Sequence, residues 1–269
     1  MFPTLSLGPL TFSTYTVLID IGLVGALAWL WYRAPAHGCE SARWLDAGLS
    51  GAAGAFLGGR LAFAFGNWAY FQNHVAEIFR LWDGGYAWPG AVAGGLIGLL
   101  IYCAARKESL TIILDELALP ALALGALGWI GCAAVSCASG ADVPPGILPF
   151  AVNWPDLYGV VLPRWPSQII GLGLTLAASG YLFSQRDRHW PRGFHFAASI
   201  TLIAASSFFV SLVRGDDMAL MGAWRLDAVT NAAITLLGIV SLAALWALEP
   251  ASQRKESLTA ENAESAESK

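Results

Sequence analysis

The chain has 269 residues, of which 56% are hydrophobic and 13% are charged, and its formal net charge is −4. Soluble domains are about 45–50% apolar and about 25% charged, so this composition excludes a disordered chain, a nucleic-acid binder and an ordinary soluble enzyme. The 12 Trp and 29 Gly fit a polytopic helical membrane protein, because membrane helices tolerate Gly and place Trp at the interfaces.

Seven apolar runs with few charges predict membrane-spanning helices of about 20 residues each. In chain order they cover residues 14–32, 46–66, 88–105, 111–135, 167–184, 195–213 and 226–248. Together they predict one all-α, seven-helix membrane domain over residues 1–249. Residues 250–269 have no aromatic side chain and are rich in Ser, Glu and Ala, which predicts a disordered cytoplasmic tail.

The basic residues between the runs predict the orientation of the helices. Most of the 15 Lys and Arg follow the first, third, fifth and seventh runs. These residues are Arg33, Arg43, Arg106, Lys107, Arg186, Arg188, Arg192, Arg254, Lys255 and Lys269. Because short cytoplasmic loops carry the excess of Lys and Arg, the N-terminus is expected outside and the C-terminus in the cytoplasm.

Four arginines lie on the expected outer side, where the charge rule disfavours them. They are Arg80, Arg164, Arg214 and Arg225. As a set, they suggest a site for an anion at the outer face. The alternative for each is neutralisation by a nearby acid, which would be Asp83 for Arg80, Asp216 or Asp217 for Arg214, and Asp227 for Arg225.

A charge in the middle of a membrane costs about 2.5–3.5 kcal/mol, so such residues face the protein interior and usually have a function. Arg60 follows Gly58–Gly59 inside the second run, and its planar guanidinium matches phosphate oxygens. The alternative is that Arg60 extends to the outer interface. Asp20 is a second candidate, which could instead pair with a neighbouring helix. Asp115 and Glu116 open the fourth run, where the helix dipole favours acids.

Two outer loops carry further signals. Residues 74–82 have apolar side chains at helical spacing, which predicts an amphipathic helix on the membrane face. The long loop 136–166 contains six Pro and strand-like pieces such as Phe150–Trp154. Ser167 and Gln168 then open the fifth run beside Arg164, where a helix N-terminus can bind an anion. Capping of that helix by Ser167 is the alternative.

The four cysteines form no metal-ligand pattern. Cys132 and Cys137 lie five residues apart near a helix end, and they are interpreted as small apolar residues. Neither a metal nor a cofactor is expected.

Six blocks in fixed order resemble the prolipoprotein diacylglyceryl transferase family of bacterial inner membranes. The resemblance runs from Tyr15 to about Leu248. The blocks are Tyr15, Gly59–Leu61, Trp82–Gly85 with Gly90, Leu127–Cys132, Pro149–Asp156 with Leu162–Gln168, and Phe208–Val210 with Arg214 and Asp217.

The resemblance implies transfer of a diacylglyceryl group from phosphatidylglycerol to the lipobox Cys thiol of a prolipoprotein, in a multi-pass protein of the bacterial inner membrane. Its partners would be phosphatidylglycerol, the prolipoprotein signal-peptide region and membrane lipids, with no nucleic acid. By position, the expected catalytic residues are Tyr15, Arg60 and Arg214. The expected substrate-binding residues are Gly85, Gly90, Arg164, Ser167 and Gln168.

The sequence departs from the family pattern where polar residues are expected. Pro89 and Trp165 replace two His, Trp129 replaces the signature Arg, and Ser207 and Ser211 replace an Arg and a Glu. The family pattern has an Asn and a Glu directly after this signature, and residues 132–136 of this chain contain neither. Activity is therefore expected to be weak or altered, and the alternative is a non-catalytic relative that binds a lipid or lipoprotein. A transporter is disfavoured because the polar residues collect on one side.

Overall fold

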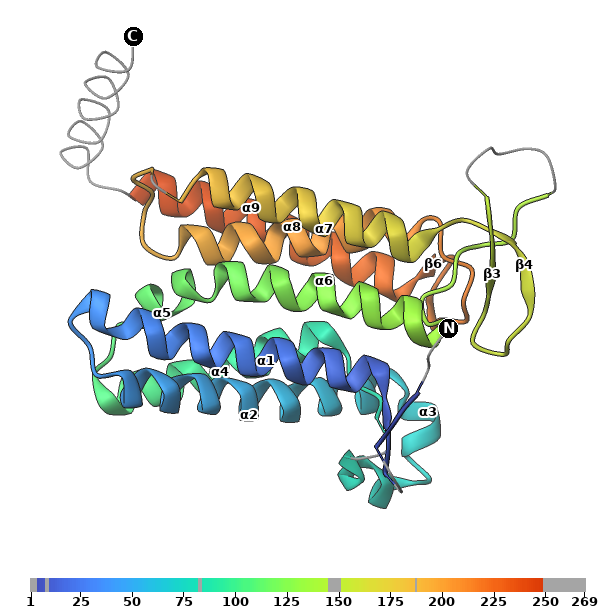
Figure 1. Ribbon diagram of the computed structural model, residues 1–269, viewed down its shortest axis with the longest axis horizontal. Helices are drawn as coiled ribbons and strands as arrows, with labels where there is room; N and C mark the ends of the chain where they lie inside the picture. The colour runs from blue at the N-terminus through green and yellow to red at the C-terminus, as the bar shows by residue number, and fades with distance from the viewer. Residues whose placement is uncertain (1–3, 8–9, 82–83, 145–150, 187, 249–269) are drawn as a thin grey trace, which may run out of the picture.

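The computed structural model describes residues 4–7, 10–81, 84–144, 151–186 and 188–248. Within these residues, seven helices of 18 or more residues lie side by side along the long axis of the molecule (Figure 1). They are α1 (Thr14–Arg33), α2 (Ser41–Gly66), α4 (Trp88–Arg106), α6 (Ala118–Val135), α7 (Ser167–Ser184), α8 (Phe194–Ser211) and α9 (Leu226–Leu248). The predicted mostly helical architecture is confirmed, and the expected tail at 250–269 lies outside the described residues.

Five of these helices are long and apolar enough to cross a membrane: α1, α4, α6, α8 and α9. The other two, α2 and α7, are 26 and 18 residues long but less apolar. The chain therefore has the character of a multi-pass membrane protein, whereas the number of seven spans and their orientation remain predictions.

Two groups of helices share one bundle. Helices α1, α2 and α4 form one group and α7, α8 and α9 the other, while α6 packs against α1 on one side and against α7 and α8 on the other (Figure 1). A buried cluster that includes Leu30, Trp44, Leu99 and Ile113 fills the first group. Side chains from α6, α7 and α8 fill the second, which fixes both groups to the central α6.

The fourth apolar run is not one helix, which corrects the prediction for residues 111–135. It forms α5 (Leu110–Glu116) and α6, with the break at Leu117. Pro120 explains the break, because proline has no backbone N–H to bond to Glu116 O and its ring clashes with the carbonyl four residues earlier.

The acids at this break have partners on other helices. The Asp115 carboxylate accepts hydrogen bonds from the backbone N–H groups of Gly193 (2.6 Å) and Phe196 (3.2 Å), at the start of α8. Glu116 accepts two bonds from Arg33. The interpretation that these acids stabilise the N-terminus of their own helix is wrong, since Asp115 supports the N-terminus of α8 instead.

Three short hairpins occupy the end of the bundle where α1 begins (Figure 1). They pair β1 (Thr4–Leu7) with β2 (Leu10–Ser13), β3 (Val152–Pro155) with β4 (Val161–Arg164), and β5 (Leu220–Met221) with β6 (Trp224–Arg225). Of the strand-like piece expected at Phe150–Trp154, residues 152–154 lie in β3, whereas Phe150 lies outside the described residues. We call this end, with α3 (Trp68–Phe71) and the loops around it, the loop end.

The described part of residues 74–82 does not form the amphipathic helix that the spacing predicts. The described part is a short 3-10 helix, η2 (Val75–Phe79). The carbonyls of Glu77 and Ile78 point to the guanidinium of Arg60, so they are turned away from the bonding pattern of an α-helix. Phe79 stays 75% exposed.

Candidate functional site

The predicted site residues lie at the loop end, in two groups. Arg60, Gly85 and Gly90 belong to α2, α4 and the segment that joins them. Arg164, Ser167, Gln168 and Arg214 belong to a structure that we call the cap, formed by residues 137–143, 164–168 and 212–216.

Arg60 is 4% exposed and is surrounded by backbone carbonyls. Its Nε donates to Ile78 O at 3.0 Å, Nη2 donates to Glu77 O, and Nη1 donates to Gly84 O and to Gly85 O. Four of the five N–H donors of a guanidinium are thus engaged. In this arrangement Arg60 holds the α2–α4 segment on α2, and phosphate binding by Arg60 stays a prediction.

The two glycines of this group have steric reasons to be glycine. Gly85 has φ +76°, and a Cβ there would lie 2.5 Å from the Phe63 ring. A Cβ at Gly90 would overlap Ala62 Cβ, because α4 crosses α2 at backbone contact. Their assigned role in substrate binding is not tested by this geometry, which accounts for both residues through packing.

The cap is a small set of extended segments centred on Gly140. Gly140 bridges to Arg214 on one side, and Asp142 bridges to Arg164 on the other. The backbone bonds Ala141 N–H to Val213 O (2.8 Å) and Trp165 N–H to Ala141 O (3.1 Å) fix the three segments together. A Cβ at Gly140 would overlap Trp165 O, so only glycine fits there.

Arg164 is 7% exposed and contacts two acids that the sequence patterns did not single out. Nη1 lies 3.0 Å from Asp142 Oδ1, and Nη2 lies 3.0 Å from Asp156 Oδ2. The Nε–H of Arg164 is buried with no hydrogen-bond partner among the described residues. Arg164 thus has two anionic partners and one unused donor within the cap.

Arg214 is part of a cluster of four charges. Its Nε and Nη2 bind both oxygens of Asp216, and Nη1 lies 3.3 Å from Asp227 Oδ2. Arg225 contacts the same two acids, at 3.3 Å from Asp216 and 3.1 Å from Asp227. Neutralisation by nearby acids, which the sequence left open, is what the structure shows for Arg214 and Arg225. For Arg80 the suggested partner Asp83 lies outside the described residues.

The charges of this cluster affect the Asp216 carboxyl. Burial acts to raise its pKa, but the hydrogen bond from Arg214 and the positive charges of Arg214 and Arg225 outweigh burial. The pKa of Asp216 therefore lies below its ordinary value. An anion that entered the cluster would have to compete with this carboxylate for Arg214.

Ser167 and Gln168 fix the turn that follows α6. Ser167 is fully buried, and its hydroxyl donates to Ala138 O, while Gln168 Nε2 donates to Cys137 O at 2.8 Å. No side-chain cap bond is found at the start of α7, so the alternative that Ser167 caps this helix is wrong. The hydroxyl is occupied by the 137–138 turn instead.

Cys132 and Cys137 form a disulfide, which corrects their interpretation as small apolar residues. The bond links the last turn of α6 to the start of the cap, across Ser136 with φ 62°. Their five-residue spacing around a predicted outer turn was the available signal.

Tyr15 of α1 and Trp129 of α6 both pack near the end of α6 that carries the disulfide. The Tyr15 ring packs on Gly131, where an added Cβ would meet its Cδ2 at 2.8 Å. The Trp129 indole packs on Gly171 of α7, where a Cβ would overlap the ring. Tyr15 therefore packs on the last turns of α6, whereas Trp129 fills the space between α6 and α7.

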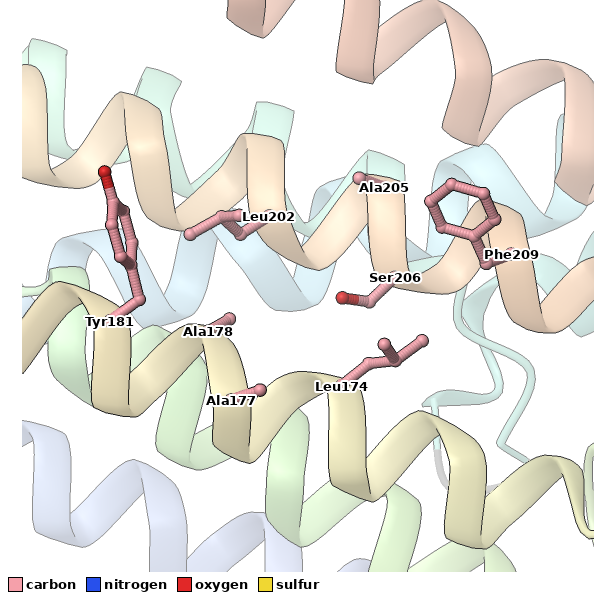
Figure 2. Close-up of a pocket in the computed structure, with 8 residues that line it drawn as sticks. All are labelled: Leu174, Ala177, Ala178, Tyr181, Leu202, Ala205, Ser206 and Phe209. Carbon is pink, nitrogen blue, oxygen red and sulfur yellow. The ribbon is translucent and has the colours of Figure 1, made fainter.

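An apolar groove of about 310 Å³ lies between α7 and α8. Figure 2 shows Tyr181 and Phe209 at its two ends, small side chains along its length, and the hydroxyl of Ser206 pointing into it. No group of three or more metal-ligating side chains is found in the described part of the chain.

Residues 3–245 match the model of the family described as prolipoprotein diacylglyceryl transferase. The chain belongs to this family.

Relatives named phosphatidylglycerol–prolipoprotein diacylglyceryl transferase support the membership at modest identity. The chain is 26% identical to the protein of Symbiobacterium thermophilum over 89% of this chain and 90% of that protein. It is 31% identical to that of Nitratidesulfovibrio vulgaris, over 79% and 80%. It is 30% identical to that of Salmonella paratyphi B, over 81% and 82%.

Three of the positions at which departures from the family pattern are expected have structural roles in this chain. Pro89 lies in the first turn of α4, a position that proline favours. Ser211 is 2% exposed and donates to Phe208 O in its own helix. Trp165 supplies the carbonyl that packs on Gly140. These residues stabilise the helices and the cap without providing a free charge.

Proposed function

We propose that this protein transfers a diacylglyceryl group from phosphatidylglycerol to the lipobox Cys thiol of a prolipoprotein, with weak or altered activity. The observation that carries the proposal is the family match over residues 3–245. The names of the relatives at 26–31% identity supply the substrates. The substitutions at Trp129 and Ser207 motivate the lowered activity.

In the proposed reaction the thiol sulfur forms a bond to the terminal glyceryl carbon of the lipid. The bond from that carbon to the phosphate oxygen breaks, its electron pair leaves with glycerol phosphate, and the thiol proton is released to a base. A cationic group near the leaving phosphate would stabilise the developing charge. We assign this role to Arg214 and Arg60, with Arg164, Ser167, Gln168, Gly85 and Gly90 shaping the lipid site and Tyr15 beside it.

Arg214 is the better placed of the two arginines for this role. Its partners are two carboxylates that could rotate, and its side chain is 18% exposed. Arg60 instead donates to four fixed carbonyls, so binding a phosphate would require movement of the α2–α4 segment. The groove between α7 and α8 could take part of an acyl chain, since small apolar side chains line it.

We further propose seven membrane spans in the bacterial inner membrane, with the loop end and N-terminus outside and the C-terminus in the cytoplasm. The distribution of Lys and Arg supports this orientation. The Cys132–Cys137 disulfide supports it independently, because disulfides persist in oxidising compartments and this one lies at the loop end.

The proposal is tested by following glycerol phosphate. The purified protein in phosphatidylglycerol vesicles is mixed with a lipobox peptide, and release of glycerol phosphate is measured beside the Salmonella relative. The proposal expects release that needs the peptide thiol and that is slower than for the relative. Release that is equal with a Cys→Ala peptide, or absent while the relative reacts, would contradict it.

The alternative, a non-catalytic relative that binds a lipid or lipoprotein, has one specific observation in its favour. Trp129 replaces the expected arginine and fills the space against Gly171. The two arginines of the cap, Arg164 and Arg214, both pair with acids. Binding of the lipobox peptide to the vesicles without any release of glycerol phosphate would favour this alternative.

A further inference from the structure

The Cys132–Cys137 disulfide connects a long apolar helix to the cap. Cys132 lies in the last turns of α6, and Cys137 is the first residue of the cap. Neither cysteine is fully buried. A soluble reductant at the loop end can therefore reach the S–S bond while the helices stay folded.

The turn that the disulfide closes has a backbone conformation that its residues disfavour. Ser136 has φ 62° and Ala138 has φ 54°, on either side of Cys137. Residues with a Cβ rarely adopt this left-handed region, which glycine enters at little cost. The turn is held by the disulfide and by the bond from Cys137 N–H to Cys132 O at 3.0 Å. The disulfide thus constrains a turn that the side chains around it do not favour.

Backbone hydrogen bonds carry the position of this turn to the rest of the cap. They run from Gly215 N–H to Ser139 O (2.9 Å), from Ala141 N–H to Val213 O (2.8 Å) and from Val143 N–H to Pro163 O (2.8 Å). The first two bonds lie on the two sides of Arg214 in the chain. In addition, Arg164 Nη1 donates to Gly140 O at 3.4 Å. The placement of both cap arginines therefore depends on the segment that starts at the disulfide.

We propose that the Cys132–Cys137 disulfide is a redox switch that orders the cap. A dithiol reduces the bond: it gives two electrons and two protons, both cysteines become thiols, and the dithiol becomes a disulfide. Ser136 and Ala138 then relax out of the left-handed region. Residues 137–143 lose their bonds to residues 163–165 and 213–215, and reoxidation restores them.

The switch has a consequence for the transfer reaction, and this part of the inference rests on the proposed function. The oxidised cap holds the backbone of Arg214, which we assign to the leaving phosphate. A charged donor stabilises a transition state only when it is held in place before the reaction. Reduction should therefore lower the release of glycerol phosphate, whereas the response of the cap itself needs no turnover.

Hydrogen–deuterium exchange measures the order of the cap directly. The whole protein, in vesicles of phosphatidylglycerol and phosphatidylethanolamine, is compared before dithiothreitol, after it, and after reoxidation with oxidised glutathione. Reduction should speed exchange about tenfold at the amides of Ala141 and Gly215, and reoxidation should reverse the change. The Ala87 amide, which donates to Gly59 O at 3.0 Å in the α2–α4 segment, is the internal control and should stay unchanged.

Glycine substitutions test whether the left-handed turn causes the release. A protein with both Ser136→Gly and Ala138→Gly adopts the same turn at little cost, with or without the disulfide. After reduction, its cap amides should exchange more slowly than those of the reduced unchanged protein. Lys107→Gly is the matched control, because Lys107 has φ 58° at the end of α4, outside the cap. Its cap should respond to dithiothreitol as the unchanged protein does.

A protein with both Cys132→Ser and Cys137→Ser represents the reduced state. Its cap amides should exchange as fast as those of the reduced unchanged protein, and they should ignore dithiothreitol. Exchange in the cap that is equal before and after reduction would overturn the switch. The same holds for thiols that appear only when the Ala87 amide also loses protection, because the bond would then break by general unfolding. A double-glycine protein that responds like the unchanged one would contradict the role of the turn.

The switch and the proposed function can fail separately. Cap amides that follow the redox state, in a protein that releases no glycerol phosphate, would count against the proposed function alone. Thiol-dependent release from a protein whose cap ignores dithiothreitol would count against the switch alone.

Discussion

At the scale of single residues, the arginines of the loop end illustrate what sequence can and cannot provide. Their position predicted an anion site, and the near acids Asp216 and Asp227 could be named as partners from spacing alone. The acids that bind Arg164, in contrast, come from segments 22 and 8 residues away, Asp142 and Asp156. No periodicity predicts such contacts, because they depend on how the cap folds.

Removal of Arg214 provides a test of its proposed role at the leaving phosphate. Arg214→Ala should lower the rate of transfer about a hundredfold, as loss of one charge-stabilising donor does in other enzymes. Arg43→Ala is the control, since its ion pairs with Glu40 and Glu108 lie at the far end of the bundle. Equal rates for Arg214→Ala and the unchanged protein would remove Arg214 from the site.

The Asp216 cluster predicts a dependence of stability on pH. Because its pKa is lowered by folding, Asp216 stabilises the folded state above its ordinary pKa of about 3.9. This contribution is lost as the pH falls through the lower, folded pKa. Thermal unfolding in detergent should therefore show a smaller drop on acidification for Asp216→Asn than for the unchanged protein. Parallel curves for the two proteins would contradict this assignment.

At the scale of elements, apolar runs predicted the long helices closely, because membrane helices need about 20 apolar residues wherever they pack. The prediction was wrong at Leu117, where Pro120 ends α5, and at η2, which Arg60 holds in another conformation. The disulfide was also missed, since the sequence does not reveal that the chain after α6 turns back on its last turn. Each miss depends on a local contact that overrides the general pattern.

The contact between α2 and α4 predicts a large effect from a small side chain. A Cβ at Gly94 would overlap Gly54 O, so Gly94→Ala should force the helices apart and cost about 1–3 kcal/mol. Gly25→Ala on α1 has open space around the new methyl and serves as the matched control. Thermal unfolding in detergent should show a lower midpoint for Gly94→Ala only, and equal midpoints would contradict the close packing.

The disulfide predicts a second loss of stability at this scale. Replacing both Cys132 and Cys137 by Ser should destabilise the cap by about 2 kcal/mol, given the short loop that the bond closes. In the unchanged protein, thiol alkylation without reductant should modify neither of the two cysteines. Alkylation of both, in protein isolated from membranes, would contradict the disulfide and its support for an outer loop end.

At the scale of the whole molecule, family membership and the multi-pass helical bundle agree with each other. The proposed reaction depends on a smaller set of side chains, and the resemblance places Pro, Trp or Ser at several of their positions. The fold could thus be predicted from hydropathy and from the order of the six sequence segments that resemble the family. Whether the remaining arginines suffice for catalysis depends on their freedom to leave Asp216, Asp227 and the carbonyls around Arg60.

The most direct measurement is the mass of a lipobox peptide after incubation with the purified protein and phosphatidylglycerol vesicles. The proposed transfer predicts a product heavier by one diacylglyceryl group, attached to the Cys sulfur as a thioether, and no product with a Cys→Ala peptide. A peptide of unchanged mass, under conditions in which the Salmonella relative converts it, would contradict the transferase function and leave a binding role for this protein.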